Sequence, residues 1–272
     1  MKATFIGGGN MATALAGGLL ARGVDARDLR IVEPLEAQRE RLRLRMPGVA
    51  LYPGPGADAL AGADMVVFAV KPQQMRDAVS AVAPHVAAIP VVLTIAAGVR
   101  CADIARWLGG YRRVVRAMPN TPALVGAGIS ALYATAEGKP VAQPAVDVLE
   151  ACGEIVWCAD EQDLDAVTAV SGSGPAYVFY FLEALEQAAV ELGLPPQEAR
   201  RLAYATFDGS MRLARSVSDA PATLRANVTS KGGTTAAALA VLDAAGVRER
   251  IVLAVKAAAL RATELGDAYG ND

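Results

Sequence analysis

The amino-acid sequence predicts an α/β domain followed by an all-α domain. Up to about residue 158, short apolar segments alternate with helical stretches, which is typical of a parallel sheet with crossover helices. The first apolar segment runs directly into a turn of three glycines, Gly7 to Gly9. After Asp163 the strand patterns stop, and helical patterns punctuated by glycine and proline continue to the end. We therefore place the first domain at residues 1–160 and the second at residues 161–272.

The strands predicted in the first domain are short and rich in aliphatic residues. They cover Ala3 to Ile6, Leu29 to Glu33, Met65 to Ala69, Val91 to Ile95 and Arg113 to Ala117, with strand-like segments at Gly128 to Tyr133 and Glu154 to Trp157. The uncharged run from Ala78 to Val99 has the length of a membrane span, but Pro84 and Pro90 interrupt it. We expect a buried strand at this place and no membrane contact.

The helices predicted in the second domain begin and end at glycine or proline. They cover Ala176 to Leu192, Gln197 to about Val217, Thr234 to Ala245 and Val247 to Leu265. We expect the segment Ser171 to Pro175 to be a flexible loop. The helix that follows is apolar on almost every side, so it must be buried in a core or against another subunit.

The composition excludes several classes of function. Hydrophobic residues form 53% of the chain and charged residues 20%, which excludes a disordered protein. The aromatic share is 5%, so the excess apolar surface lies in small side chains suited to close packing or to a ligand. A net charge of -2 argues against a basic surface that binds nucleic acid. Three cysteines and one histidine argue against a metal site. Without a signal-peptide pattern, we expect a cytoplasmic protein with reduced thiols.

The glycine turn carries the pattern G-x-G-x-x-A, which ends at Ala12. Gly7 suits a tight turn, Gly9 allows close approach of a pyrophosphate, and the helix start supplies amide donors. The position of the pattern at the start of a βαβ series predicts a Rossmann-type dinucleotide-binding domain. Glu33 ends the second predicted strand, where an acidic residue often holds the ribose hydroxyls of NAD. Arg39 or Arg41 instead suits a 2′-phosphate, so the residues leave NADH and NADPH open.

Three further strand ends belong to the same edge of the predicted sheet. They are Ala69-Val70-Lys71-Pro72, Ala96-Ala97-Gly98 and Met118-Pro119-Asn120-Thr121-Pro122. Open α/β sheets bind ligands outside the carboxyl ends of their strands. A cofactor that lies across these ends explains their small and proline-rich sequences together.

A polar segment precedes the predicted helix at residue 234. Asn227-Val228-Thr229-Ser230-Lys231-Gly232-Gly233-Thr234-Thr235 combines hydroxyl and amide side chains with two glycines. Free amides and the positive end of a helix favour a small anion such as a carboxylate. His85 is the only histidine and lies in an apolar stretch, so histidine acid–base catalysis has little support.

With these motifs the chain resembles the pyrroline-5-carboxylate reductases, the enzymes of the last step of proline synthesis. The strings F-I-G-G-G-N-M-A, A-V-K-P, M-P-N-T-P, D-A-V-T-A-V-S-G-S-G-P-A-Y, L-G-L-P and V-T-S-K-G-G-T-T follow the order of the family. The resemblance implies hydride transfer from a reduced nicotinamide to the C=N carbon of a cyclic imine. It also implies a homodimer formed by the helical domain and, in many members, a decamer of five dimers.

The resemblance further implies the site residues. Cofactor contacts fall on Ile6, Gly7, Gly8, Gly9, Asn10, Met11, Ala69, Val70, Lys71, Pro72, Ile95, Ala96 and Ala97. To these we add Glu33 and Asn120, because of their places at strand ends. Substrate contacts fall on Glu161, Asn227, Ser230, Gly233, Thr234 and Thr235, with Thr235 as the catalytic residue beside the ring nitrogen. Family precedent favours NADPH with NADH usable, although Gly56 replaces an asparagine that binds the adenosine moiety in some members.

Two alternatives belong to other classes of function. One is a reductase of a different imine or oxo acid on the same scaffold. The other is a non-catalytic sensor of nicotinamide cofactors whose helical domain serves only as an interaction surface. Oxidation of a reduced cofactor by pyrroline-5-carboxylate distinguishes all three.

Overall fold

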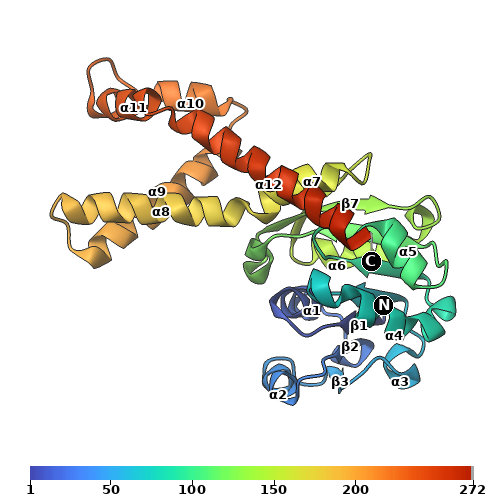
Figure 1. Ribbon diagram of the computed structural model, residues 1–272. Helices are drawn as coiled ribbons and strands as arrows, with labels where there is room; N and C mark the ends of the chain where they lie inside the picture. Colours follow the sequence, from blue (N-terminus) through green and yellow to red (C-terminus); the bar gives the residue numbers. More distant parts are fainter. Residues whose placement is uncertain (271–272) are drawn as a thin grey trace. The chain divides into compact units, whose positions relative to one another are not determined.

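The computed structural model in Figure 1 describes residues 1–270. Packing divides the chain into two compact units. Unit 1 comprises Met1–Ser173 together with the segment that begins at Ala258, and unit 2 comprises Gly174–Ala257. Residues 161–173 therefore pack with the sheet, and the division between residues 160 and 161 stays a prediction.

Unit 1 is built on one eight-stranded sheet in the order β3-β2-β1-β4-β5-β6-β7-β8. The strands are β1 Ala3–Ile6, β2 Leu29–Val32, β3 Ala50–Tyr52, β4 Met65–Phe68, β5 Val91–Thr94, β6 Val114–Met118, β7 Gly128–Ala134 and β8 Gly153–Trp157. All seven predicted strands are confirmed to within one residue at each end, and β3 is additional. The predicted parallel arrangement is confirmed for every neighbouring pair except β6 and β7, which run antiparallel. Only a short 3-10 turn, η4 Thr121–Val125, joins these two strands, and a parallel pair requires a longer crossover.

Helices cover both faces of the sheet, which Figure 1 shows for unit 1. Alternate residues of each strand enter two separate apolar clusters: Met65 and Val67 of β4 join one, Val66 and Phe68 the other. The first cluster includes residues of α1 Asn10–Ala21, α2 Glu36–Arg45 and α6 Gln143–Glu150. The second includes residues of α3 Ala57–Leu60, α4 Met75–Val82, η3 Ala83–Ala88 and α5 Cys101–Trp107. The remaining short elements of unit 1 are η1 Ala26–Asp28, η2 Pro72–Gln74, η5 Lys139–Val141 and α7 Asp163–Val167.

Unit 2 is entirely helical among its described residues. It contains α8 Gly174–Glu191, α9 Pro196–Ser216, α10 Pro221–Asn227, α11 Thr234–Ala244 and the first part of α12 Val247–Gly270. The four long helices were predicted, but α10 was not, and α12 continues past its predicted end at Leu265.

The prediction of a flexible loop at Ser171 to Pro175 is wrong. A π-helical turn, η6 Thr168–Gly172, leads directly to α8. The amide of Ser173 donates to the carbonyl of Thr168 at 2.8 Å, a spacing of five residues. The wide turn accommodates glycine and serine residues that resemble a loop in the sequence.

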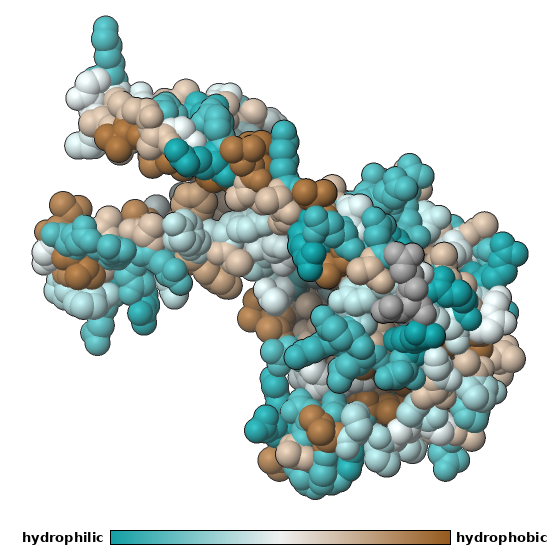
Figure 2. Space-filling model, viewed as in Figure 1, coloured by the Kyte–Doolittle hydropathy of each residue, from teal (hydrophilic) through white to brown (hydrophobic). Residues whose placement is uncertain are grey.

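The helices of unit 2 expose large apolar side chains within one chain. No residue of α8 is buried, and Phe179 and Tyr180 are 58% and 71% exposed. Leu253 on α12 and Val241 on α11 are also exposed, and Figure 2 shows apolar surface along these helices. A partner surface is required to bury them. Among the described residues, no helix combines the length and the apolarity needed to cross a membrane.

Candidate active site

The glycine turn is pressed against the end of β4. Gly7 has a φ of +100°, and a Cβ atom at this position would lie 2.9 Å from the carbonyl oxygen of Ala69. Its amide donates to the carbonyl of Val32 at 2.8 Å. Only glycine fits this conformation and this contact. The turn therefore joins the ends of three neighbouring strands, β2, β1 and β4.

The start of α1 is open to a ligand. Gly9 is the N-cap residue, no side chain caps the helix, and a Cβ atom at Gly9 would meet no other atom within 4 Å. The first amides of the helix are thus available at its positive end. This arrangement fits the pyrophosphate of a dinucleotide.

Glu33 holds the glycine turn from the neighbouring strand. Its Oε2 accepts a hydrogen bond from the Gly8 amide, and its Oε1 accepts one from the Leu35 amide, both at 3.0 Å. The Gln38 side chain donates to the Gly8 carbonyl at 2.8 Å. Glu33 is 8% exposed, so it places a buried negative charge beside the turn.

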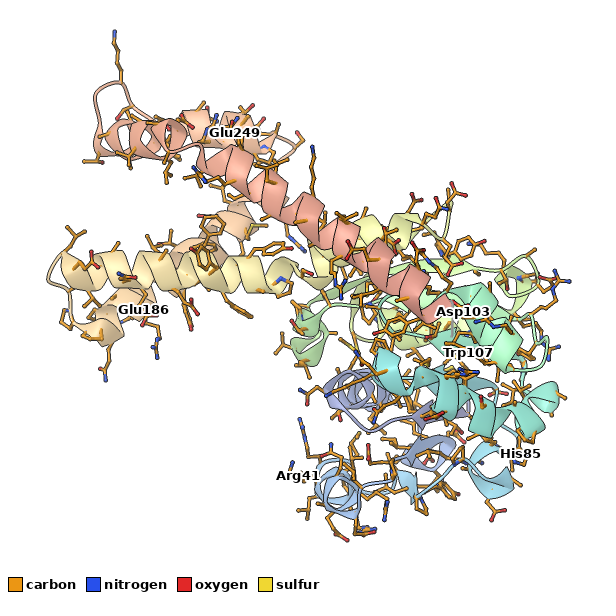
Figure 3. The ribbon with its side chains drawn as sticks, viewed as in Figure 1. Arg41, His85, Asp103, Trp107, Glu186 and Glu249 are labelled. Atoms are coloured by element: carbon orange, nitrogen blue, oxygen red, sulfur yellow. The ribbon has the colours of Figure 1, made fainter. Side chains whose placement is uncertain are left out.

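The two arginines considered for a 2′-phosphate have different surroundings. Arg39 donates to the carbonyl oxygens of Glu33 and Pro34 at 2.6 and 2.8 Å, and it pairs with Glu36. Its guanidinium is therefore used in fixing the turn after β2. Arg41 is exposed on α2, where Figure 3 labels it.

A cleft of about 580 Å³ runs along this edge of the sheet. It brings together eight of the predicted cofactor residues: Ile6, Gly7, Gly8, Gly9, Glu33, Ala69, Val70 and Lys71. Its charged lining residues are Glu33, Lys71 and Asp77. Pro53 and Pro55 also line the cleft but are not among the predicted residues, because β3 is not among the predicted strands. The Pro53-Gly54-Pro55 turn was the available signal.

Seven predicted cofactor residues lie outside the lining of this cleft. Asn10 and Met11 open α1, Pro72 opens η2, and Ile95, Ala96 and Ala97 follow β5. The Ile95 amide donates to the Phe68 carbonyl at 3.2 Å, so the ends of β4 and β5 are adjacent. Asn120 accepts from the Ile129 amide at 3.0 Å and donates to Ser171 Oγ at 3.2 Å. Its side chain therefore fastens η4 to β7.

Glu161 belongs to a buried ionic cluster of unit 1. One of its oxygens accepts from the Cys101 amide at 2.7 Å and from Arg116 at 3.0 Å. Arg116 is 2% exposed and also lies 3.6 Å from Asp165. Arg100 donates to Asp165 at 2.8 Å. Burial and the neighbouring Glu161 carboxylate raise the pKa of the Cys101 thiol.

The predicted anion site lies in unit 2 at the start of α11. Gly233 is the N-cap residue, and no side chain caps this helix. Ser230 Oγ packs against Gly233, where a Cβ atom would lie 2.4 Å away. Asn227 ends α10, so the structure brings together five of the six predicted substrate residues: Asn227, Ser230, Gly233, Thr234 and Thr235. Glu161, the sixth, belongs to unit 1.

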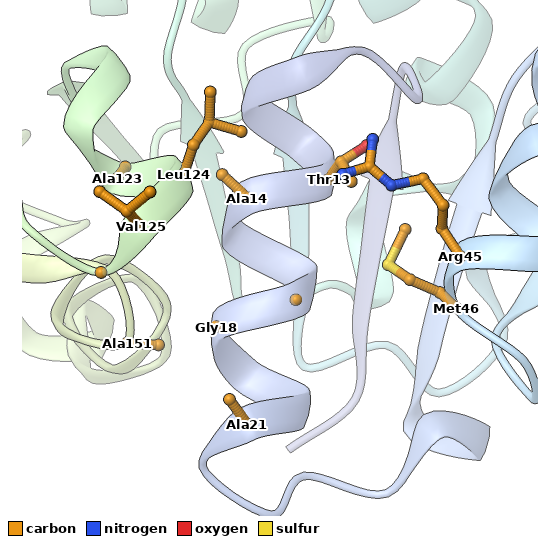
Figure 4. Close-up of a pocket in the computed structure, with 12 residues that line it drawn as sticks. Thr13, Ala14, Gly18, Ala21, Arg45, Met46, Ala123, Leu124, Val125 and Ala151 are labelled. Carbon is orange, nitrogen blue, oxygen red and sulfur yellow. The ribbon is translucent and has the colours of Figure 1, made fainter.

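A second cleft of unit 1, of about 420 Å³, contains none of the predicted site residues. Figure 4 shows its walls: Ala14, Gly18 and Ala21 of α1 face Leu124 and Val125 of η4. The cleft lies along the side of α1 rather than at its N-terminus. It is therefore separate from the candidate cofactor cleft.

The doubly wound sheet, the glycine turn and the uncapped α1 define a Rossmann-type oxidoreductase with a helical second unit. A family model for NADP oxidoreductases, coenzyme F420-dependent, matches residues 2–98, and one for pyrroline-5-carboxylate reductase dimerisation matches residues 161–265. The chain is 42% identical to the pyrroline-5-carboxylate reductase of Pseudomonas aeruginosa over 99% of its length and 98% of the relative. It belongs to the pyrroline-5-carboxylate reductase family.

Solved structures give the same result. A pyrroline-5-carboxylate reductase from Coxiella burnetii matches with a TM-score of 0.88 and 37% identity, over 97% of this chain and 98% of that one. The Plasmodium falciparum pyrroline carboxylate reductase, solved with NADP bound, matches with a TM-score of 0.86 and 27% identity over 98% of each chain. The relationship therefore extends over both units.

Proposed function

We propose that this chain reduces L-1-pyrroline-5-carboxylate to L-proline, the final step of proline biosynthesis, with NADPH as hydride donor and NADH as a usable substitute. The observation that carries the proposal is 42% identity to a reductase of this name over 99% of the chain. The glycine turn and the open start of α1 supply a fitting cofactor cradle. The relative solved with NADP bound supports the choice of NADPH.

In this proposal the residues of unit 1 bind and orient the cofactor. The amides at Gly9 and the start of α1 hold the pyrophosphate, and Glu33 lies toward the adenosine ribose. The small residues after β4 and β5 let the backbone approach the nicotinamide end. Bound NADPH supplies the hydride that reduces the C=N carbon.

The start of α11 binds the substrate carboxylate through Ser230, Gly233 and Thr234. No side chain caps α11, Ser230 is exposed and Thr235 is half-buried, so both hydroxyl groups are accessible to a ligand. The hydroxyl oxygen of Thr235 accepts a hydrogen bond from the ring N–H of the protonated imine. An imine that is already protonated needs no strong general acid, in agreement with a site that lacks histidine.

Asn227 and Glu161 take a smaller part in the proposed substrate site. Asn227 is exposed at the end of α10, next to the segment that carries Ser230. The Glu161 carboxylate already accepts hydrogen bonds from Arg116 and from the Cys101 amide. We therefore assign Glu161 to the support of the site rather than to direct substrate contact.

The partner that we propose for unit 2 is a second copy of the chain. The matched family model is one of dimerisation, and the exposed apolar side chains of α8, α9, α11 and α12 require cover. Assembly of five such dimers into a decamer is a further proposal from family precedent. The free thiols and the cytosolic supply of reduced nicotinamide favour a cytoplasmic location.

A cofactor-oxidation assay tests the proposed reaction. Purified protein is mixed with NADPH and pyrroline-5-carboxylate, and the loss of reduced nicotinamide absorbance and the formation of proline are followed together. Parallel reactions contain NADH, a different cyclic imine, or a 2-oxo acid. We expect proline to form in equal amount to the NADPH oxidised. Protein that binds NADPH but oxidises it with none of these substrates would contradict the proposal.

A further inference from the structure

The end of α12 lies against the loop that follows β5. Gly98 has a φ of +80°, and a Cβ atom there would lie 3.3 Å from both the Gly266 nitrogen and the Leu265 Cβ atom. Both glycines are buried. A side chain on Gly98 would crowd α12, so the loop and this helix end are in direct contact and a shift of the helix end is felt by the loop.

Charged groups fasten the same loop at its next residues. Arg100, the N-cap residue of α5, donates to Asp165 at 2.8 and 3.3 Å. The Thr263 hydroxyl on α12 lies 3.1 Å from the same carboxylate and 3.3 Å from the Ala259 carbonyl, so two acceptors share its proton. A Cβ atom on Gly266 would lie 2.9 Å from the Arg100 guanidinium. The helix therefore contacts both members of the Arg100–Asp165 ion pair.

The far end of the loop is held by Glu161. Its carboxylate accepts from the Cys101 amide, the first residue of α5, and from the buried Arg116. Further along α5, Arg106 donates to the carbonyl of Gly270 at 3.1 Å. The loop at residues 95–100 is thus fixed at the end of β5, at Gly98 and at the start of α5.

We propose that the segment Ala258–Gly270 is a brace that positions the loop at residues 95–100 for cofactor binding. Gly266, Thr263 and Arg100 are positioning residues, because none of them is placed in the cofactor cleft. The inference rests on the proposed function, in which Ile95 to Ala97 contact the nicotinamide end of the cofactor. A rigid loop binds the cofactor more tightly, since less conformational entropy is lost on binding.

Substitution of the brace tests this role. Gly266→Ala places a methyl group against the Arg100 guanidinium, and Arg100→Ala removes the guanidinium. Each variant is expected to raise the KM and the Kd for NADPH by about threefold to tenfold while kcat stays within about twofold. The double variant is expected to be no worse than the more impaired single variant, because both changes act through one contact. Kd is measured by nicotinamide fluorescence without substrate.

A second pair of variants guards against misfolding of Gly266→Ala. Thr263→Val removes the hydroxyl and is expected to raise the Kd, and Thr263→Ser is expected to restore it. Glu264→Gln is the matched control, because Glu264 pairs with Arg261 on the exposed side of the same helical turn. All variants are compared at equal secondary structure and oligomeric state.

The outcomes separate this inference from the proposed reaction. If Gly266→Ala, Arg100→Ala and Thr263→Val all bind NADPH as the natural chain does, the brace is wrong and the reaction stands. If the natural chain binds NADPH but does not reduce pyrroline-5-carboxylate, the proposed reaction is contradicted. The Kd values for NADPH then still test whether Ala258–Gly270 acts as a brace. Additive losses in the double variant also contradict a shared contact. A natural chain that does not bind NADPH overturns both.

Discussion

Glu33 Oε2 accepts a hydrogen bond of 3.0 Å from the amide of Gly8, which lies in the turn between β1 and α1. The contact joins the end of β2 to the glycine turn that lines the candidate cofactor cleft. Glu33 is buried and lines this cleft, so little water screens its charge from a ligand bound there. In the proposed complex that ligand group is the adenosine ribose. The carboxylate shapes the turn, and in the proposed cofactor complex its charge makes the 2′-phosphate of NADPH bind less tightly than it would beside a neutral side chain.

Glu33→Gln is expected to shift the cofactor preference toward NADPH. The change removes one negative charge, and two unit charges 4 Å apart in water interact by about 1 kcal/mol, a factor of about five in binding. We expect the ratio of kcat/KM for NADPH to that for NADH to rise by about this factor. Glu40→Gln is the control, because Glu40 pairs with Arg43 on the exposed side of α2. An unchanged ratio in Glu33→Gln would show that the 2′-phosphate lies elsewhere.

Gly7→Ala is expected to weaken both folding and cofactor binding. The positive φ costs about 1–3 kcal/mol for a residue with a side chain, and the new methyl group meets the Ala69 carbonyl. Gly17→Ala on α1 is the control, since a Cβ atom there meets nothing within 4 Å and alanine favours a helix by up to about 1 kcal/mol. Urea denaturation and NADPH titration measure the two effects. Equal stability of the two variants would contradict the strained turn.

The sequence predicts the strands of unit 1 well because central parallel strands are continuous apolar runs. β3 escapes this reasoning, since Ala50–Tyr52 has only three residues and is half-buried at the sheet edge. Arg116 shows a second limit. It lies within a strand predicted from its apolar neighbours, and its partners come later in the chain, Glu161 from a turn and Asp165 from α7. Such non-local pairs leave no pattern at short spacing.

The sequence also predicts the main groups of site residues, but it does not predict which partner each side chain contacts. The glycine turn and the start of α11 carry local signals, because helix starts and tight turns restrict nearby residue types. Arg39 carries no such signal. Its guanidinium binds the carbonyl oxygens of Glu33 and Pro34, and an arginine that binds its own backbone looks the same in the sequence as one that binds phosphate.

Thr235→Ala is expected to lower kcat by about tenfold to a hundredfold, since a hydrogen bond to a charged group contributes about 1.5–3 kcal/mol. The Kd for NADPH is expected to stay unchanged. Thr235→Ser keeps the hydroxyl and retains most of the activity. Thr223→Ala is the control, because Thr223 is exposed on α10. Steady-state kinetics with both substrates decide the matter, and an unchanged kcat in Thr235→Ala would remove this residue from the mechanism.

The three cysteines are expected to react with iodoacetamide at different rates. Burial raises the pKa of Cys101 and Cys152, and both residues are 3% exposed. A raised pKa reduces the thiolate at about pH 8, and the thiolate is the form that reacts. Cys158 is half-buried, so it is expected to react first, although burial raises its pKa too. Mass spectrometry of the native protein gives the order. Faster modification of Cys101 than of Cys158 would contradict the closed packing at α5.

Arg116→Met is expected to destabilise unit 1 by about 3–5 kcal/mol, because it takes the shared cation from one buried and one half-buried carboxylate. These carboxylates belong to Glu161 and Asp165, with side chains 20% and 9% exposed. Arg112→Ala is the control: Arg112 pairs with Glu137 at 3.0 Å, but the two side chains are 73% and 41% exposed. Loss of such a surface pair costs about 1 kcal/mol or less. Chemical denaturation at constant protein concentration compares the two variants, since dimer formation contributes to stability. Similar losses in both would mean that Asp165 keeps sufficient compensation from Arg100, which lies 2.8 Å away.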